Sequence, residues 1–211
     1  MGEPMIRLGI DTSTALVQVA ICDDAEPLAV FDSPTGLRHG EDLAPAIAQT
    51  LTMAALKVTA LREIVVGVGP GPFTGLRVGL ITARTLAFAL GIPVIGVCSL
   101  DVLAADVVAE EFLVATDARR KEVYLAHYRR GSRVSGPTVL KPGDVASALP
   151  VAGEGALLYP EHFPNAIGPT HPGGATLCRV VAEQSVELLP PEPLYLRRPD
   201  TAAPRPPKRV S

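Results

Sequence analysis

The pattern of apolar and polar positions in the first half of the chain predicts a sheet covered by helices. An apolar run at 5–11 is followed by alternation at 16–22, which is typical of two strands joined by a turn. Strands at 5–11, 16–22, 28–32, 64–68 and 93–97 and helices at 41–56 and 74–90 complete the predicted set. Their order favours an α/β protein with a mixed sheet, in which a meander is continued by parallel strands with helical crossovers.

The second half begins the same pattern again in reduced form. Both halves open with an apolar strand that ends in an aspartate, Asp11 and Asp117. The segments predicted after the first half are helices at 99–110, 144–149 and 175–188 and strands at 112–117, 122–128, 133–140 and 156–158. Two copies of one pattern predict two lobes, which we place at residues 1–100 and 101–190, with a tail at 191–211.

Glycine and proline alternate in the loop before the second predicted helix, where the sequence reads GVGPGPFTGLRVG at 67–79. Prolines fix their own φ and glycines adopt angles closed to other residues, so this loop turns sharply and stiffly. Free amides at a helix start suit an anion. However, the loop lacks the lysine of a GxxxxGK[ST] phosphate loop, and its prolines remove amide donors. The spacing therefore favours close packing over phosphate binding.

The helix after this loop has two faces of different character. A stripe of apolar residues predicts the buried face: Leu76, Leu80, Ala83, Ala87 and Leu90. Thr74 is a suitable N-cap and Gly91 ends the helix. Gly75 and Gly79 lie four residues apart on a neighbouring face with Thr82 close by, a flat strip on which a second helix can lie. Packing of these glycines on the chain's own sheet is an equally good interpretation.

Composition narrows the classes of protein. The 211 residues are 47% hydrophobic, which suffices for one large domain or two small ones. Because no apolar run reaches membrane-spanning length and the start does not resemble a secretory signal, we expect a cytoplasmic protein. The net charge of −3 argues against a chain that holds nucleic acid by itself, although basic residues gather at 129–133 and in the tail. Cys22, Cys98 and Cys178 are widely spaced in apolar sequence, which favours buried reduced thiols.

Four segments together resemble one family. They are LGIDTST at 8–14, HGEDL at 39–43, the glycine loop at 67–79 and DARRKEVY at 117–124. Along nearly its whole length the chain is similar to the TsaB family, also called YeaZ, and the GPGPFTGLRVG segment is highly specific to it. The first aspartate turn is shared with actin, sugar kinases and heat-shock chaperones. The resemblance therefore implies the actin-like ATPase (ribonuclease H-like) fold with two lobes.

The resemblance also implies a role in the threonylcarbamoyl modification of the adenosine beside the anticodon of tRNA. Proteins of this family do not carry the chemistry: they pair with TsaD, which holds the metal and the threonylcarbamoyl-adenylate, and the ATPase TsaE joins the pair. Without TsaD the same surface forms a homodimer. The chain is thus expected to be a noncatalytic subunit with no cofactor of its own. ATP could bind at the interface with the partner, and tRNA would be contacted only through the complex.

For this chain the resemblance makes the glycine loop and its helix a hypothetical partner surface. We assign to this surface Gly71, Phe73, Thr74, Gly75, Arg77, Val78, Gly79 and Thr82. The substitution Gly79→Arg is then expected to weaken association while the fold stays largely intact. Unfolding of that variant would instead place the glycine in the internal core.

The aspartate turns argue against catalysis. Asp11 could orient a magnesium-bound water, and Thr12 and Ser13 could donate to phosphate as a vestige of nucleotide binding. We favour the simpler interpretation that these side chains stabilise the turn. In the second turn, at 117–121, side chains stand where an ATPase of this fold needs glycines. The Gly-Gly pair at 173–174 falls where kinases of this fold carry their adenosine loop. Such a pair is common before helices, so we favour a structural role for it.

No metal site is expected. TsaD-type proteins bind metal with an HxxxH pair on a helix, whereas this chain offers His39 alone, which we interpret as a loop or capping residue before an acidic helix start. The leading alternative is a small ATPase or sugar kinase of the same superfamily, whose turnover Asp11→Ala would abolish. A zinc peptidase is a second alternative that metal analysis would test.

The last residues differ from the rest of the chain. The segment at 194–197 resembles the close of the family, where the chain returns to the lobes. Residues 201–211 are rich in proline and basic residues and cannot bury much apolar area, so we expect them to be mobile.

Overall fold

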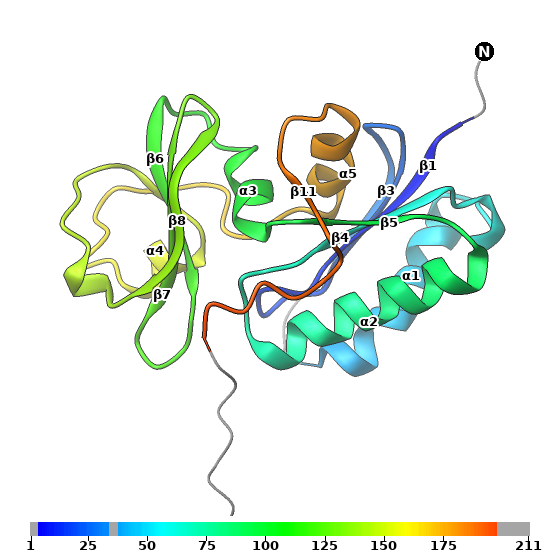
Figure 1. Ribbon diagram of the computed structural model, residues 1–211, viewed down its shortest axis with the longest axis horizontal. Coiled ribbons are helices and arrows are strands. Elements are labelled where there is room, and N and C mark those ends of the chain that lie inside the picture. Colours follow the sequence, from blue (N-terminus) through cyan, green and yellow to red (C-terminus); the bar gives the residue numbers. More distant parts are fainter. Residues whose placement is uncertain (1–3, 34–37, 198–211) are drawn as a thin grey trace, which may run out of the picture.

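A computed structural model describes residues 4–33 and 38–197 as two lobes, each built on one mixed β-sheet (Figure 1). In spatial order, the first sheet contains β11 (Leu188–Leu189), β5 (Val94–Val97), β4 (Glu63–Gly67), β1 (Ile6–Asp11), β2 (Gln18–Asp23) and β3 (Glu26–Asp32). The second contains β10 (Ala166–Ile167), β9 (Val151–Ala152), β6 (Glu111–Asp117), β7 (Val123–Arg129) and β8 (Ser132–Leu140). The helices are α1 (His39–Met53), α2 (Phe73–Leu90), α3 (Ser99–Ala104), α4 (Glu154–Leu158) and α5 (Gly174–Ala182), with 3₁₀ turns at Val58–Ala60 and Pro142–Asp144.

The order of the strands confirms the predicted duplication. In the first lobe β1 pairs antiparallel with β2 and parallel with β4, and in the second lobe β6 pairs antiparallel with β7 and parallel with β9. The spatial orders β3-β2-β1-β4-β5 and β8-β7-β6-β9-β10 are the same. The second copy is smaller because β9 and β10 have only two residues each.

Helices cover both faces of the first sheet. Figure 1 shows α1 and α2 below this sheet and α5 above it, in agreement with the contacts of α2 with β4 and of α5 with β1 and β2. All six residues of β1 are therefore buried, as expected for a strand with both faces covered. The predicted stripe of α2 is confirmed at Leu76, Leu80, Ala83 and Ala87, which are buried. Leu90, its last residue, is only partly buried and packs against the core of this lobe.

The ends of α2 differ in how well the sequence predicted them. Gly91 ends the helix in the left-handed conformation with φ of 66°, as expected. Thr74 is not the N-cap: Pro72 holds that position, and Thr74 is an exposed residue of the first turn. Among the described residues, only α2 has the length and hydropathy to cross a membrane, and its buried stripe is that of a helix in a globular lobe.

The boundary between the lobes lies elsewhere than predicted. Helix α5 packs on β1 and β2, and β11 pairs with β5, so both elements belong to the first sheet although they follow the second in sequence. Helix α3 contributes to the cores of both lobes: Leu100 and Leu103 pack with β6 and β7, and Val102 packs with β4 and α5. The second lobe is therefore shorter than the expected range 101–190.

Several short elements were predicted wrongly. Residues 156–158 were expected as a strand but belong to α4. The prediction failed because a short apolar run has no period that distinguishes a strand from a helix. Instead of a helix at 144–149 there is a single 3₁₀ turn that starts at Pro142. The helices expected to reach 110 and 188 end at Ala104 and Ala182.

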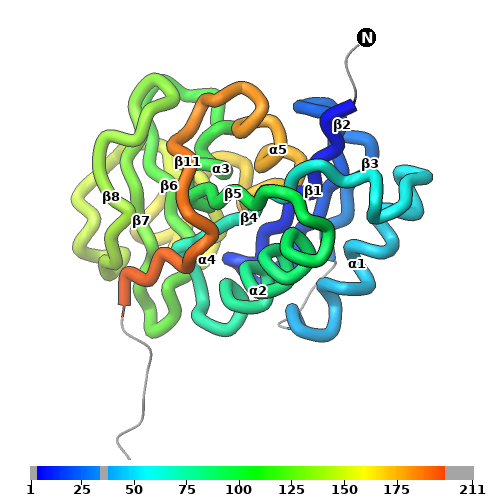
Figure 2. The backbone as a smooth tube through the Cα atoms, turned by 45° about the vertical axis from the view of Figure 1, so that its right-hand side comes forward, coloured from blue at the N-terminus to red at the C-terminus, as the bar shows by residue number. Residues whose placement is uncertain are grey.

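The last described residues run back across both lobes as an extended segment, which we call the strap (residues 190–197; Figure 2). Leu194 N donates to the carbonyl of Val68 at 2.8 Å, and the ring of Tyr195 stacks on Phe73 with centroids 5.2 Å apart. Arg197 forms an ion pair with Glu122 of the second lobe. The expected return of the chain to the lobes is confirmed, and the tail at 201–211 lies outside the described residues.

Candidate functional site

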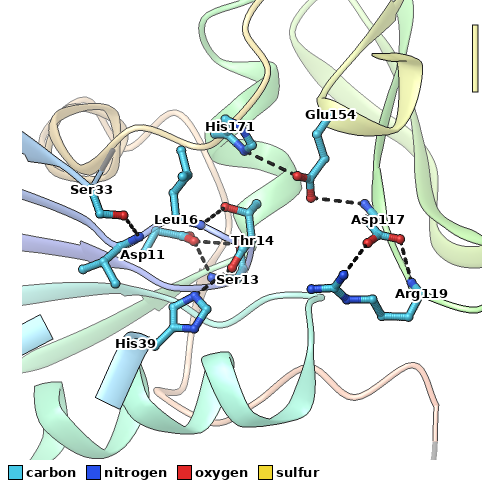
Figure 3. Close-up of polar contacts among 11 residues, drawn as sticks. Asp11, Ser13, Thr14, Leu16, Ser33, His39, Asp117, Arg119, Glu154 and His171 are labelled. Carbon is cyan, nitrogen blue, oxygen red and sulfur yellow. Dashed lines mark hydrogen bonds and ion pairs between the residues drawn. The ribbon is translucent and has the colours of Figure 1, made fainter. Parts of the chain in front are cut away.

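The carboxylate of Asp11 lies at the end of β1, at the junction of the lobes, and is fully occupied by nearby donors (Figure 3). The amide and the hydroxyl of Ser13 donate to its Oδ1 at 2.7 and 2.6 Å, and Ser99 Oγ donates to its Oδ2 at 2.7 Å. Asp11 is 1% exposed, and burial raises its pKa while these hydrogen bonds oppose the rise. The carboxylate therefore has no solvent-facing side for a metal-bound water, and the geometry matches that of a stabilised turn.

The start of α2 packs directly on the Asp11 turn. A Cβ added to Gly71 would lie 2.3 Å from the carbonyl oxygen of Ser13, and one added to Gly75 would lie 2.6 Å from that of Thr12. A Cβ on Gly79 would lie 2.3 Å from Thr12 Oγ1, which itself donates to the carbonyl of Gly75 at 2.8 Å. Only glycine allows this approach, so α2 fills the space in front of the turn.

This packing corrects the interpretation of the glycine strip. Gly71, Gly75 and Gly79 are buried contacts within the first lobe and are not part of the surface. The expectation that Gly79→Arg would leave the fold largely intact is therefore wrong on steric grounds. The sequence missed this because helical spacing shows which residues share a face but not what that face touches.

The other residues assigned to the partner surface remain accessible. Thr74 and Arg77 are exposed, and Phe73, Val78 and Thr82 are half-buried. The same side of α2 also presents two large apolar side chains that the sequence analysis did not single out, Ile81 at 61% and Phe88 at 90% exposure. Their spacing of seven residues, two turns of helix, was the available signal.

His39 is the first residue of α1 and packs behind the Asp11 turn. It is buried, its Nε2 lies 2.9 Å from the carbonyl oxygen of Thr14, and its ring approaches Gly75. Glu41 and Asp42 occupy the first turn of α1, as expected for the positive end of a helix. His39 thus joins α1 to the turn, and within residues 4–33 and 38–197 no three His, Cys, Asp or Glu side chains gather as a metal site.

The second aspartate turn faces the first across the junction of the lobes (Figure 3). Asp117 Oδ1 accepts from the amide of Arg119 at 2.8 Å, and the guanidinium of Arg119 lies 3.2 Å from Oδ2. Arg119, Arg120 and Lys121 have φ of 60°, 56° and 60°, a left-handed run of residues with bulky side chains. The side chain of Arg119 is thus tied back to Asp117 within the turn.

Two residues behind Asp117 were not predicted. Glu154 Oε1 accepts from the amide of Asp117 at 3.4 Å, and His171 Nδ1 lies 3.8 Å from Glu154 Oε2 (Figure 3). Burial raises the pKa of Glu154 and lowers the pKa of His171, so both are biased toward their neutral forms. These residues are 37 and 54 positions from Asp117, and no local pattern connects them.

The Gly-Gly pair before α5 is a packing device. Gly174 lies against the backbone of β2, where an added Cβ would be 2.9 Å from the amide nitrogen of Ala20. A Cβ on Gly9 would in turn lie 2.2 Å from the carbonyl oxygen of Gly174. These close approaches pack the start of α5 against β1 and β2, and the geometry supports the structural interpretation of the pair.

Comparison with known proteins agrees with the fold. The family model described as "TsaD: tRNA N6-adenosine threonylcarbamoyltransferase" matches residues 34–165. An uncharacterized protein of Mycobacterium leprae is 45% identical over 205 residues, which are 92% of this chain and 55% of that protein. An uncharacterized protein of Mycobacterium tuberculosis is 42% identical over 92% of both chains. The chain thus spans about half the length of the first relative and nearly all of the second.

Relatives with an assigned role are named TsaB, and two similar solved structures carry the name YeaZ. The tRNA threonylcarbamoyladenosine biosynthesis protein TsaB of Escherichia coli is 35% identical over 127 residues, 58% of this chain and 54% of that protein. YeaZ from Pseudomonas aeruginosa has a TM-score of 0.73 at 28% identity, over 91% of this chain and all of that one. A second Pseudomonas aeruginosa structure, described as similar to peptidase YeaZ, gives 0.76 at 30% identity over 92% of this chain and all of that one.

The duplicated sheets and the facing aspartate turns define a two-lobed protein with the actin-like fold, whose first turn is filled by its own helix. The chain belongs to the TsaB/YeaZ family, which is involved in the biosynthesis of threonylcarbamoyladenosine in tRNA.

Proposed function

We propose that this chain is a noncatalytic scaffold subunit that pairs with a TsaD-type protein, joined by TsaE, in the threonylcarbamoyl modification of tRNA. Membership of the TsaB/YeaZ family supports the pathway. The observation that carries the noncatalytic role is the filled first turn. Asp11 is enclosed by three donors, and the glycines of α2 leave no room for a phosphate beside Thr12 and Ser13.

The second turn supports the same conclusion. An ATPase of this fold needs open phosphate turns in both lobes, but here Arg119 is tied back to Asp117 and the following residues carry long side chains. The chemistry and the metal would then come from the partner. Nucleotide bound by the complex would lie at the junction between the two subunits.

The accessible side of α2 is the proposed docking face for the partner. Phe88 and Ile81 expose large apolar surfaces two turns apart, and Met53 at the end of the neighbouring α1 is 55% exposed. Apolar side chains that gather on adjacent helices are typical of protein interfaces. In the absence of the partner the same face would join two copies of this chain.

The direct test is co-expression with the TsaD-type protein of the same organism, followed by pull-down and size-exclusion chromatography. We expect a stable heterodimer that Phe88→Asp weakens at least about tenfold, because a charge would be buried in an apolar contact. Val108→Asp is the matched control, since Val108 is fully exposed but lies between α3 and β6. Absence of association, or equal losses in both variants, would refute the proposed docking face.

A further inference from the structure

A group of basic side chains surrounds the point where the strap joins the two lobes. We call it the basic rim and define it as Arg77, Arg119, Arg120, Lys121 and Arg197. A pocket of about 160 Å³ lies within it, between the start of α2, the second aspartate turn and the strap. The described residues that line this pocket include three arginines of the rim and no aspartate or glutamate.

The charge of the basic rim stands out from the rest of the chain. Five cations gather here although the whole chain has a net charge of −3. Two of them are paired, Arg119 with Asp117 and Arg197 with Glu122. Arg77 lies over the ring of Phe73, 3.9 Å from its centroid. Within the described part of the chain, neither Arg77 nor Lys121 has a carboxylate partner.

The other basic cluster found in the sequence is different. Arg129 pairs with Glu111, Arg130 with Glu110, and Arg133 with Glu187 and Asp101. Acidic side chains therefore neutralise the cluster at 129–133. The basic rim is where an excess of positive charge remains.

The backbone of the second turn points to a use for its side chains. Three successive residues with side chains adopt φ near 60°, a conformation that is unfavourable with a Cβ and natural for glycine. Arg119, Arg120 and Lys121 are exposed, so the interior does not require their side chains. Strained backbone that presents functional groups is characteristic of binding sites.

Aromatic rings lie beside the cations. Phe73 and Tyr195 stack with an interplanar angle of 23°, Arg77 Nε donates to the hydroxyl of Tyr195 at 2.9 Å, and Tyr195 is 37% exposed. Cations that follow a backbone and rings on which bases stack are the two components of surfaces that bind single-stranded or looped RNA.

We propose that the basic rim binds the sugar-phosphate backbone of RNA. The identity of that RNA as tRNA rests on the proposed function, whereas the charge argument does not. A pocket of about 160 Å³ is small for a nucleoside triphosphate, since ligand pockets usually measure about 300–1,000 Å³. An extended polyanion instead matches cations spread over α2, the second turn and the strap.

The test compares how two variants of the full chain bind a fluorescein-labelled, unmodified tRNA transcript, measured by fluorescence anisotropy. The salt series starts at about 50 mM, because phosphate contacts are strongest at low salt. The test variant is Arg120→Gln/Lys121→Gln. The control is Arg130→Gln, because Arg130 is also exposed and left-handed, with φ of 51°, and lies at the opposite end of β7. We expect the test variant to raise Kd about 3- to 10-fold and to reduce the slope of log K against log salt by about 0.7–0.9 for each lost phosphate contact. The control should match the wild type.

Several results would overturn this inference. The first is undetectable RNA binding by the wild type, and the second is equal Kd values for the test and control variants. The third is that millimolar MgATP displaces the RNA from the wild type and that the test variant no longer binds ATP. Association with the TsaD-type partner is measured on the same variant and should be unchanged. Its loss would assign the basic rim to the partner interface, whereas failure of the wild type to associate would refute the proposed function and leave the RNA result standing.

Discussion

The contact of Gly79 with Thr12 gives the sharpest prediction about the fold. In Gly79→Ala the new Cβ would lie 2.3 Å from Thr12 Oγ1, so Thr12 has to rotate and lose its hydrogen bond to the carbonyl of Gly75. Leaving a buried hydroxyl without a partner costs about 1–3 kcal/mol. Alanine in place of glycine inside a helix returns up to about 1 kcal/mol. We therefore expect the free energy of unfolding to fall by about 1–2 kcal/mol.

The matched control is Gly40→Ala. Gly40 is also helical, in α1, but a Cβ there would meet nothing within 4 Å. This variant should gain up to about 1 kcal/mol, because only the flexibility of the unfolded chain changes. Urea unfolding followed by far-UV circular dichroism measures both free energies.

A double-mutant cycle tests the contact itself. In a Thr12→Ala background the clashing hydroxyl is gone, and the remaining Cβ lies 3.5 Å from the added methyl, an ordinary contact. Gly79→Ala should then be neutral or stabilising, with a coupling energy of about 1–2 kcal/mol. The packing account is refuted if Gly79→Ala stabilises the wild type as Gly40→Ala does, or if the cycle shows no coupling.

Two further predictions concern buried groups. Burial raises the pKa of Asp101, which accepts a hydrogen bond from Tyr128 at 2.7 Å. The folded state therefore binds the carboxyl proton of Asp101 more tightly than the unfolded state does. The contribution of Asp101 to stability then falls as pH rises above its unfolded pKa of about 4. In urea unfolding across pH 4–7, Asp101→Asn should gain stability relative to the wild type as pH rises, and parallel curves would contradict the assignment. The three cysteines are buried, so none should react with a disulfide reagent until urea unfolds the chain. Cys98 should be the least reactive, because burial raises its pKa to about 12. Fast labelling of the native protein would contradict this.

The sequence allowed most of the fold to be predicted because its signals are local. Alternating and helical periods located the meander, the crossover helices and the second copy that starts before Asp117. The errors fall where the period is too short to read. Strand β11 has two residues and is defined only by its pairing with β5, and α4 is a five-residue run that resembles a strand.

The site was predictable in its parts but not in its contacts. The Asp11 turn and the spacing of Gly75 and Gly79 were visible, yet their mutual packing joins positions more than 60 residues apart. Glu154 and His171 were missed for the same reason, because chain topology alone brings them to Asp117. Periodicity defines faces, and only the tertiary structure shows what each face meets.

The measurement that tests the central claim most directly is nucleotide binding and hydrolysis by the purified chain without its partner. Titration calorimetry with MgATP should show no saturable binding, and phosphate release should not exceed that of the isosteric variant Asp11→Asn, because the first turn is filled by α2. Saturable MgATP binding with turnover that Asp11→Asn abolishes would contradict the account and make this chain an ATPase.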